Sequence, residues 1–213
     1  MNSNLISISG IDGSGKSTQL DLLKKYYEDL GFKVIYLWSR GGSTSGINKL
    51  KSFLRLIAGK NLPPSGKSKK RDEMFKNIFI QYIWIYAAIL DLLRIYAFSI
   101  RWNLLIGKKV ICDRYIWDTL IDFKIMFPEL EIERWLIWKI LVKSVPIPFK
   151  QILLMIPIKT SIARCSQKFD PFPDSPEIRE KRYSLYVDIS NDTKFITIDA
   201  KQSSAAVFKQ IIK

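Results

Sequence analysis

Short apolar runs alternate with longer segments of helical periodicity along almost the whole chain. The apolar runs predict strands at Leu5 to Ser9, Lys33 to Trp38, Val110 to Cys112, Gln151 to Ile156 and Phe195 to Ile198. Spacings near 3.6 residues predict helices from Lys16 to a stop at Gly31, and over 47–58, 117–127, 131–143, 160–168, 177–189 and 205–212. This alternation favours an α/β fold, with a five-stranded, mainly parallel sheet that helices cover on both faces.

The longest apolar segment runs from Asp72 to Ile106. Asp91, Arg94 and Arg101 interrupt it, so the sequence contains no uninterrupted apolar span of about 18 residues. The pattern therefore favours one or two buried helices over a membrane-spanning segment. The polar, basic stretch 59–71 predicts a mobile surface loop, which is either solvated or in contact with nucleic acid or an anionic surface.

Composition narrows the chemistry further. The chain has 213 residues and no histidine, which excludes imidazole bases, Ser-His-Asp and Cys-His sites and histidine-ligated metals. Its length predicts a single domain over 1–213. Two cysteines are too few for a disulfide framework, and no basic and apolar leader opens the chain, so we expect a cytoplasmic protein. A net charge of +14 favours polyanionic partners without choosing among nucleic acid, membrane surfaces and nucleotide phosphates.

A phosphate-binding motif, G-x-x-x-x-G-K-[ST], spans Gly10 to Ser17 in full. It follows a predicted strand and opens a predicted helix, which is the context that such a loop requires. Glycines let successive backbone N–H groups point at phosphate oxygens, and the start of the helix adds a positive dipole end. Lys16 would reach the β- and γ-phosphates of a nucleotide, and the Ser17 hydroxyl would ligate Mg²⁺.

A second candidate group ends the predicted strand Val110 to Cys112. Asp113 is placed to hold the metal, directly or through water, and Arg114 follows it at once. Ligands of doubly wound sheets bind beyond the carboxyl ends of the strands, so this pair could serve a metal and a phosphate together. A surface ion pair is the alternative interpretation.

Taken together, these motifs resemble the thymidylate kinase family of nucleoside monophosphate kinases. The likeness rests on the run from Gly10 to Gln19, on Asp113-Arg114-Tyr115, on Ile198-Asp199-Ala200, and on Arg40-Gly41-Gly42 as a shortened Arg-Glu-Pro-Gly-Gly-Thr loop. The resemblance implies a three-layer P-loop kinase fold with a lid loop at about 165–177. It also implies transfer of the ATP γ-phosphate, with Mg²⁺, to a nucleoside monophosphate such as dTMP.

Roles are carried over position by position. Gly10 and Gly13 to Thr18, including Ser14 and Gly15, would hold the ATP phosphates. Asp12, Arg40, Arg114 and Tyr115 would contact the acceptor, and the turn at Ala200 to Ser203 would border adenine. Gly13 stands where one group of family members has an arginine, so the resemblance implies that the lid supplies the cations, from Arg164 and Lys168. Arg164 could instead stack on adenine or be a surface charge, and Lys168 could be a solvated lysine at a helix end.

Two departures affect the choice of acceptor. The family's Ala-Ala-x-Arg element, which reads thymine, becomes Ala87-Ala88 followed by Ile89 and Leu90. The family also has a serine and an Ala-Tyr-Gln run after the Asp-Arg-Tyr motif, and this chain has the segment 116–123 in their place. There, Asp118 and Asp122 could contact an acceptor or face solvent. Buried polar groups are what give such sites their discrimination, so the identity of the base stays open.

Three functions follow from these patterns. The leading one is a nucleoside monophosphate kinase in which Lys16, Asp12, Arg114, Mg²⁺ and the lid cations stabilise the transferring phosphoryl group. The second keeps the loop but phosphorylates another small acceptor. The third is a non-catalytic nucleotide-binding module on a membrane or nucleic acid. The segment around Trp135, Trp138 and Leu141 predicts a core helix or a homodimer contact.

Overall fold

The computed structural model describes residues 2–38, 73–166, 174–192 and 194–213. The predicted helix at 47–58, the basic loop at 59–71 and most of the predicted lid lie outside these ranges. The strands are β1 (Asn2–Gly10), β2 (Val34–Trp38), β3 (Lys109–Asp113), β4 (Pro148–Met155) and β5 (Phe195–Asp199). All their pairings are parallel, in the order β2-β3-β1-β4-β5, so the predicted sheet is confirmed.

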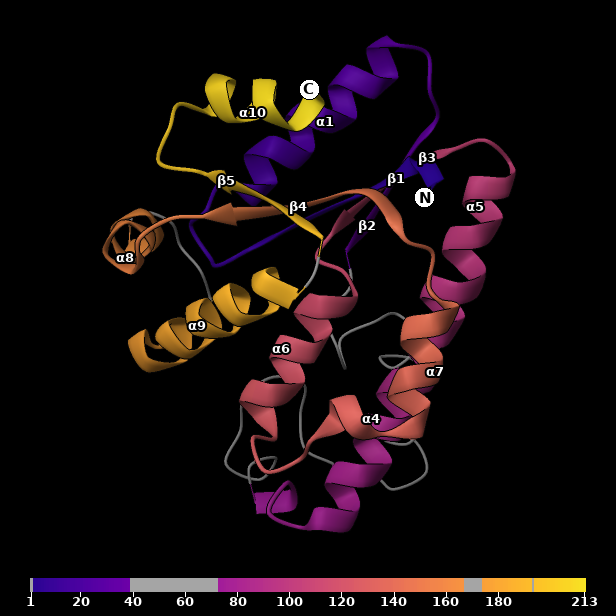
Figure 1. Ribbon diagram of the computed structural model, residues 1–213, viewed down its shortest axis with the longest axis vertical. Helices are drawn as coiled ribbons and strands as arrows, with labels where there is room; N and C mark the ends of the chain where they lie inside the picture. The colour runs from indigo at the N-terminus through magenta and orange to yellow at the C-terminus, as the bar shows by residue number, and fades with distance from the viewer. Residues whose placement is uncertain (1, 39–72, 167–173, 193) are drawn as a thin grey trace, which may run out of the picture.

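Helices cover both sides of this sheet (Figure 1), as expected for an α/β fold. On one side lie α1 (Lys16–Asp29) and α10 (Ser204–Ile212), and on the other lie α6 (Ile116–Met126) and α9 (Pro176–Asp192). The central strands β1, β3 and β4 supply fully buried side chains to the core, such as Leu5, Ile111 and Leu153. Short α8 (Ile158–Ser166) follows β4 beyond the carboxyl end of the sheet.

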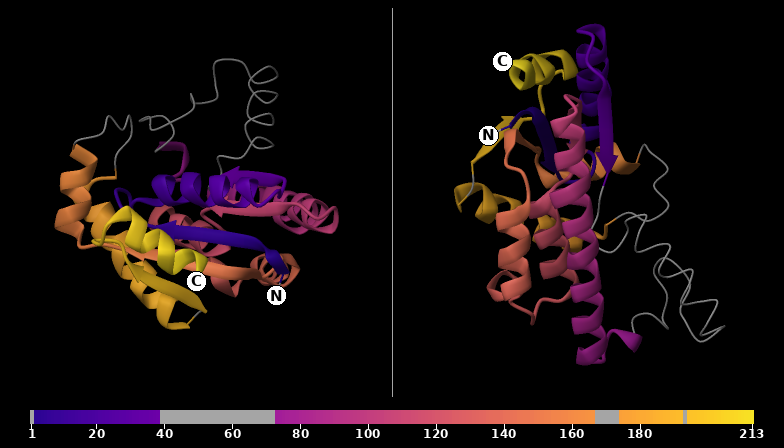
Figure 2. Two further views of the ribbon diagram at one scale, coloured as in Figure 1. Left: turned by 90° about the horizontal axis from the view of Figure 1, so that it is seen from above. Right: turned by 90° about the vertical axis from the view of Figure 1, so that its right-hand side faces the viewer.

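The predicted apolar segment forms one long helical rod (Figure 2). It consists of α4 (Ile78–Leu92), the π-helical segment η2 (Leu93–Ile100) and α5 (Arg101–Leu105). Its inner face is buried, but Phe79, Ile83, Phe98, Trp102 and Leu105 are 65–80% exposed. The expectation of buried helices therefore holds for one face only. By length and composition this rod would suffice to cross a membrane, although 28% of its most apolar window is buried inside the protein.

The predicted helix at 131–143 is interrupted. A 3-10 turn, η3 (Ile132–Arg134), precedes α7 (Leu136–Ser144), and Trp135 between them has an extended backbone. The Trp135 ring stacks on Tyr82 and Tyr86 of α4, with centroids 4.9 Å and 5.3 Å away. Trp135 thus joins two elements distant in sequence at the point where the predicted helix is interrupted.

Candidate functional site

The glycine-rich loop connects β1, which ends at Gly10, to α1, which begins at Lys16. Gly10, Gly13 and Gly15 have φ angles of 146°, 77° and 91°, a region that residues with a Cβ atom rarely adopt. A Cβ atom on Gly13 would also lie only 2.9 Å from the carbonyl oxygen of Ser161 in α8. The glycines thus allow the tight curl and the close approach of α8, and the start of α1 offers backbone N–H groups to an anion.

Lys16 lies almost buried inside this curl. Its Nζ donates hydrogen bonds to the carbonyl oxygens of Gly10 at 2.9 Å and Ile11 at 3.0 Å, and Asp12 Oδ1 is 4.0 Å away. Burial, and next the charge of Arg114, lower the pKa of Lys16 to about 8, while nearby carboxylates oppose this change. The ammonium is therefore held at the loop in a setting where an additional anion would stabilise it.

The loop's hydroxyl groups differ in their surroundings. Ser14 Oγ is buried, and no residue that the structure describes forms a hydrogen bond with it. Ser17 and Thr18 are exposed on the first turn of α1. All three lie where the sequence motif predicts ligands for phosphate or metal.

Asp113 is the last residue of β3 and lies beside Ile8 of β1. Its Oδ2 accepts a hydrogen bond from the Tyr36 hydroxyl at 2.9 Å. Its Oδ1 is buried, and no hydrogen-bond donor among the described residues reaches it. Buried polar atoms are rarely left without a partner, so this oxygen is suited to a ligand that the protein itself does not supply.

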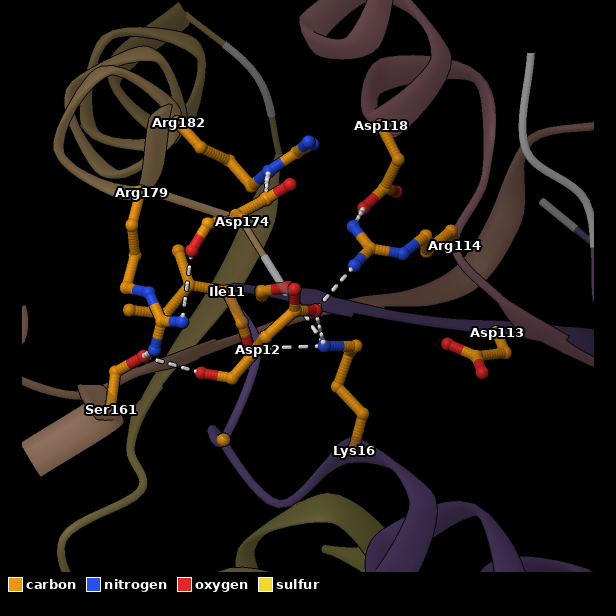
Figure 3. A network of polar contacts seen from close by, with 12 residues as sticks. Ile11, Asp12, Lys16, Asp113, Arg114, Asp118, Ser161, Asp174, Arg179 and Arg182 are labelled. Carbon is orange, nitrogen blue, oxygen red and sulfur yellow. Dashed lines mark hydrogen bonds and ion pairs between the residues drawn. The ribbon is translucent and has the colours of Figure 1, made fainter. Parts of the chain in front are cut away.

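Arg114 is brought across the carboxyl ends of the strands to the loop (Figure 3). Its Nη2 donates to Asp12 Oδ1 at 3.0 Å, and its Nη1 lies 3.6 Å from Asp118 Oδ1. Nη1 also donates to the Tyr186 hydroxyl at 3.1 Å. Burial disfavours its charge, but Tyr186 and the Asp118 carboxylate more than offset this, so the pKa of Arg114 is raised. With φ at 71°, Arg114 is the only non-glycine residue of the described chain in the left-handed region.

Helix α8 binds the outer side of the loop. The Ser161 hydroxyl donates to the Asp12 carbonyl oxygen at 2.6 Å. Arg164 Nη1 donates to the carbonyl oxygens of Gly13 at 3.3 Å and Ala200 at 3.2 Å. Arg164 thus bridges the loop and the turn after β5, the place where the resemblance puts adenine.

Asp118 and Asp122 in α6 are both buried, with 1% and 4% of their surface exposed. Asp118 accepts hydrogen bonds from the Ser9 hydroxyl at 2.6 Å and the Tyr115 backbone at 2.8 Å. Asp122 pairs with Arg182 of α9 at 2.6 Å. The interpretation that these carboxylates face solvent is therefore wrong, because both form ion pairs or hydrogen bonds inside the protein.

The remaining predicted site residues fall elsewhere. Tyr115 is buried, and its hydroxyl donates to the Pro146 carbonyl oxygen at 2.8 Å, which directs the ring away from the loop. Arg40 and Lys168 lie outside the described residues. The two cysteines are free, with Cys112 buried and Cys165 half-buried against the loop at Gly13.

Sequence reasoning missed the contribution of α9. Arg179 donates to the Ser161 hydroxyl at 2.8 Å, Arg182 binds Asp122 and Asp174, and Tyr186 binds Arg114. Spacings of three and four residues place these side chains on one face of the helix. Two arginines and a tyrosine on that stripe, in the helix that follows the predicted lid, are the signal that could have identified them.

No model of a known protein family matches the chain, but several curated proteins are similar to it in sequence. The chain is 32% identical over 165 residues to a probable thymidylate kinase of Pyrococcus horikoshii. This alignment covers 77% of the chain and 70% of that protein. A probable thymidylate kinase of Pyrococcus abyssi aligns over 222 positions at 26% identity, covering 100% of this chain and 95% of that protein. Probable thymidylate kinase 1 of Saccharolobus solfataricus is also 26% identical, over 98% of this chain and 95% of its own. The chain therefore belongs to the thymidylate kinase family.

Proposed function

We propose that the protein transfers the γ-phosphate of ATP, with Mg²⁺, to a nucleoside monophosphate, either dTMP or a related one. One observation carries this proposal. Two buried cations, Lys16 of the loop and Arg114 of the strand end, lie 4.0 Å and 3.0 Å from the same oxygen of Asp12. A lysine in an anion-binding loop suits the donor phosphates, and a separate arginine facing it suits the phosphate of a second substrate. Asp12 stands where the two would meet.

The residues present also fit a magnesium ion. Mg²⁺ prefers oxygen ligands and is commonly held by one or two protein groups together with substrate phosphates. Asp113 offers a buried carboxylate oxygen that has no hydrogen bond among the described residues, and Ser17 offers an exposed hydroxyl. The described part of the chain contains no cluster of three or more acidic or cysteine side chains that could hold a metal without a substrate. When bound, Mg²⁺ would neutralise charge on the phosphate oxygens.

The protein's own groups then have distinct roles in this proposal. The loop from Gly10 to Thr18 holds the donor phosphates through its backbone, and Lys16 moves from the Gly10 and Ile11 carbonyl oxygens to a phosphate. Arg114 holds the acceptor phosphate and neutralises charge as the phosphoryl group passes. Asp12 pairs with Arg114 before the acceptor binds and faces the acceptor afterwards. Arg164, joined by Lys168, supplies cations from the flanks of the lid, and Ala200 borders the adenine.

The proposal is tested by a coupled assay of ADP release from MgATP with each common nucleoside monophosphate. We expect at least one monophosphate to stimulate turnover, and Lys16→Met to reduce kcat by about a hundredfold or more. Lys24→Met is the matched control, because Lys24 lies on the same helix but is half exposed and, among the described residues, pairs with Glu28. A wild type that no monophosphate stimulates, or Lys16→Met with full activity, would contradict the proposal.

A further inference from the structure

Helix α9 presents polar side chains to the protein interior. Arg179, Arg182 and Tyr186 are 5%, 2% and 0% exposed. Inward faces of helices are normally apolar, because burying a guanidinium without compensation is costly. Ion pairs to Asp122 of α6 and to Asp174 compensate Arg182. Arg182 thus anchors α9 to α6, while the side chains on either side of it along the stripe reach the candidate site.

Tyr186 reaches one partner of the Asp12–Arg114 pair. Its hydroxyl accepts the hydrogen bond from Arg114 Nη1 at 3.1 Å and donates to Asp118 Oδ1 at 2.5 Å. Asp118 is itself held by the Ser9 hydroxyl and the Tyr115 backbone. Asp118 Oδ1 also lies 3.6 Å from Arg114 Nη1, and the Tyr186 hydroxyl lies 3.4 Å from the Gly10 carbonyl oxygen. The Tyr186 hydroxyl and Asp118 thus hold one end of the Arg114 guanidinium and leave Nη2 directed at Asp12.

Arg179 reaches the other partner. Its Nη1 donates to the Ser161 hydroxyl at 2.8 Å, and this hydroxyl donates to the Asp12 carbonyl oxygen at 2.6 Å, as Figure 3 shows. Its Nη2 donates to the Asp174 carbonyl oxygen at 3.3 Å. These two consecutive hydrogen bonds, from Arg179 to Ser161 and from Ser161 to Asp12, fix the position of the Asp12 backbone and therefore the place from which its side chain extends.

We propose that α9 positions the Asp12–Arg114 pair from both sides: Tyr186 holds Arg114, and Arg179 holds Asp12 through Ser161. This inference rests on the proposed function. Tyr186 and Arg179 are positioning residues, because they act on Asp12 and Arg114 rather than on substrate. When Arg114 exchanges Asp12 for an acceptor phosphate, the Tyr186 hydroxyl keeps one end of its guanidinium in place. Displacement of a reacting group by about 1 Å can cost about a hundredfold in rate, so such support matters for turnover.

The first test replaces Tyr186 by phenylalanine, which removes one oxygen and keeps the ring. We expect Tyr186→Phe to lower kcat about tenfold or more, and to change the KM for ATP little, because the loop that binds ATP is intact. Tyr183→Phe is the matched control: Tyr183 lies on the same helix, and its hydroxyl forms no hydrogen bond with any described residue. We expect this control to retain wild-type kcat.

The second test asks whether Tyr186 acts through Arg114. In an Arg114→Met background, assayed at high enzyme concentration, Tyr186→Phe should cause no further loss of kcat/KM for the acceptor. A merely structural contribution of Tyr186 would instead reduce activity by the same factor in both backgrounds. Likewise, Arg179→Met and Ser161→Ala combined should lose no more activity than the more impaired single variant. This second cycle tests the proposal independently if Tyr186→Phe does not fold.

The outcomes separate this inference from the proposed function. If the wild type is active and Tyr186→Phe is unimpaired, the inference is overturned and the proposed function stands. The same holds if, in both double-mutant cycles, the activity loss of the double variant equals the product of the two single losses. A wild type that phosphorylates no nucleoside monophosphate would overturn both. If Tyr186→Phe and Arg179→Met both lose kcat, and neither double variant loses more activity than its more impaired single variant, both the inference and the proposed function are supported.

Discussion

At the scale of single residues, the candidate site is a group of charges that compensate one another in the absence of substrate. Asp12 stabilises both Lys16 and Arg114, and the Gly10 and Ile11 carbonyl oxygens accept hydrogen bonds from the Lys16 ammonium. Phosphates would replace these interactions. Because burial already lowers the pKa of Lys16 to about 8, its charge in the free protein depends on pH within an accessible range.

This pKa predicts the alkaline limb of the pH profile. As pH rises through about 8, Lys16 of the free protein loses its proton, and with it the charge that attracts phosphate. Bound phosphates raise its pKa again, so the complex keeps the charge to higher pH. We therefore expect kcat/KM for ATP to fall above pH about 8 while kcat declines only at higher pH, as measured by initial rates. A kcat/KM for ATP that stays constant well above that pKa would contradict this assignment.

Gly13 supports a prediction about the loop's shape. Its φ angle is 77°, and a Cβ atom would lie 2.9 Å from the Ser161 carbonyl oxygen and 3.2 Å from Cys165 Sγ. Gly13→Ala should therefore cost the strain of the left-handed region, about 1–2 kcal/mol, and displace α8 as well. Gly31→Ala is the control, because Gly31 has a φ of 83° with open space around it. If thermal unfolding shows equal losses for both variants, α8 does not constrain the loop.

At the scale of elements, α9 connects the site to the rest of the fold. The Arg182–Asp122 ion pair, at 2.6 Å and with both side chains at most 4% exposed, joins α9 to α6. The loop motif and the adjacent Asp113 and Arg114 could be predicted from the sequence, because each lies within a few residues of a strand end. The polar stripe of α9 was visible in the sequence, but its partners were not, because Tyr186 and Arg114 are 72 positions apart and Arg179 reaches Asp12 only through Ser161 of α8.

The pair between α6 and α9 gives a stability prediction. Asp122→Asn removes one of the two carboxylates that pair with Arg182 among the described residues, so we expect a loss of about 3 kcal/mol in the free energy of unfolding. Glu131→Gln is the control, because its pair with Arg134 is exposed and should contribute less than about 1 kcal/mol. Denaturant midpoints of the two variants measure the difference. Equal midpoints would show that the buried pair does not hold α9 in place.

At the scale of the whole molecule, the protein combines a parallel sheet with a long helical rod whose outer face is apolar. The alternation of apolar runs and helical periodicity predicted the sheet correctly, because such patterns show which residues of each element are buried. The exposed stripe of the rod was not foreseen, because apolar periodicity cannot tell a face buried in the core from one buried by another molecule. Extended apolar surfaces of this kind usually mark a contact with a partner.

Trp138 and Leu141 are 2% and 0% exposed, so the segment around them is part of the core rather than the homodimer contact that the sequence also allowed. The homodimer stays a prediction, and we expect its contact on the rod instead. Phe98, Trp102 and Leu105 are 65–80% exposed on one stretch of η2 and α5. We expect the wild type to be a dimer in light scattering coupled to size exclusion, and Trp102→Glu to shift it toward a monomer. Leu22→Glu, on the partly exposed face of α1, is the control and should stay dimeric. A monomeric wild type at every concentration tested would refute this location.

The central claim is that one chain binds two phosphorylated substrates across Asp12 and transfers a phosphoryl group between them. The most direct measurement is ³¹P NMR of the purified protein with MgATP and a nucleoside monophosphate, dTMP first. We predict that ADP and the nucleoside diphosphate appear together in equal amounts, and that Lys16→Met produces neither. ADP that forms without a new diphosphate, or no reaction with any monophosphate, would contradict the account.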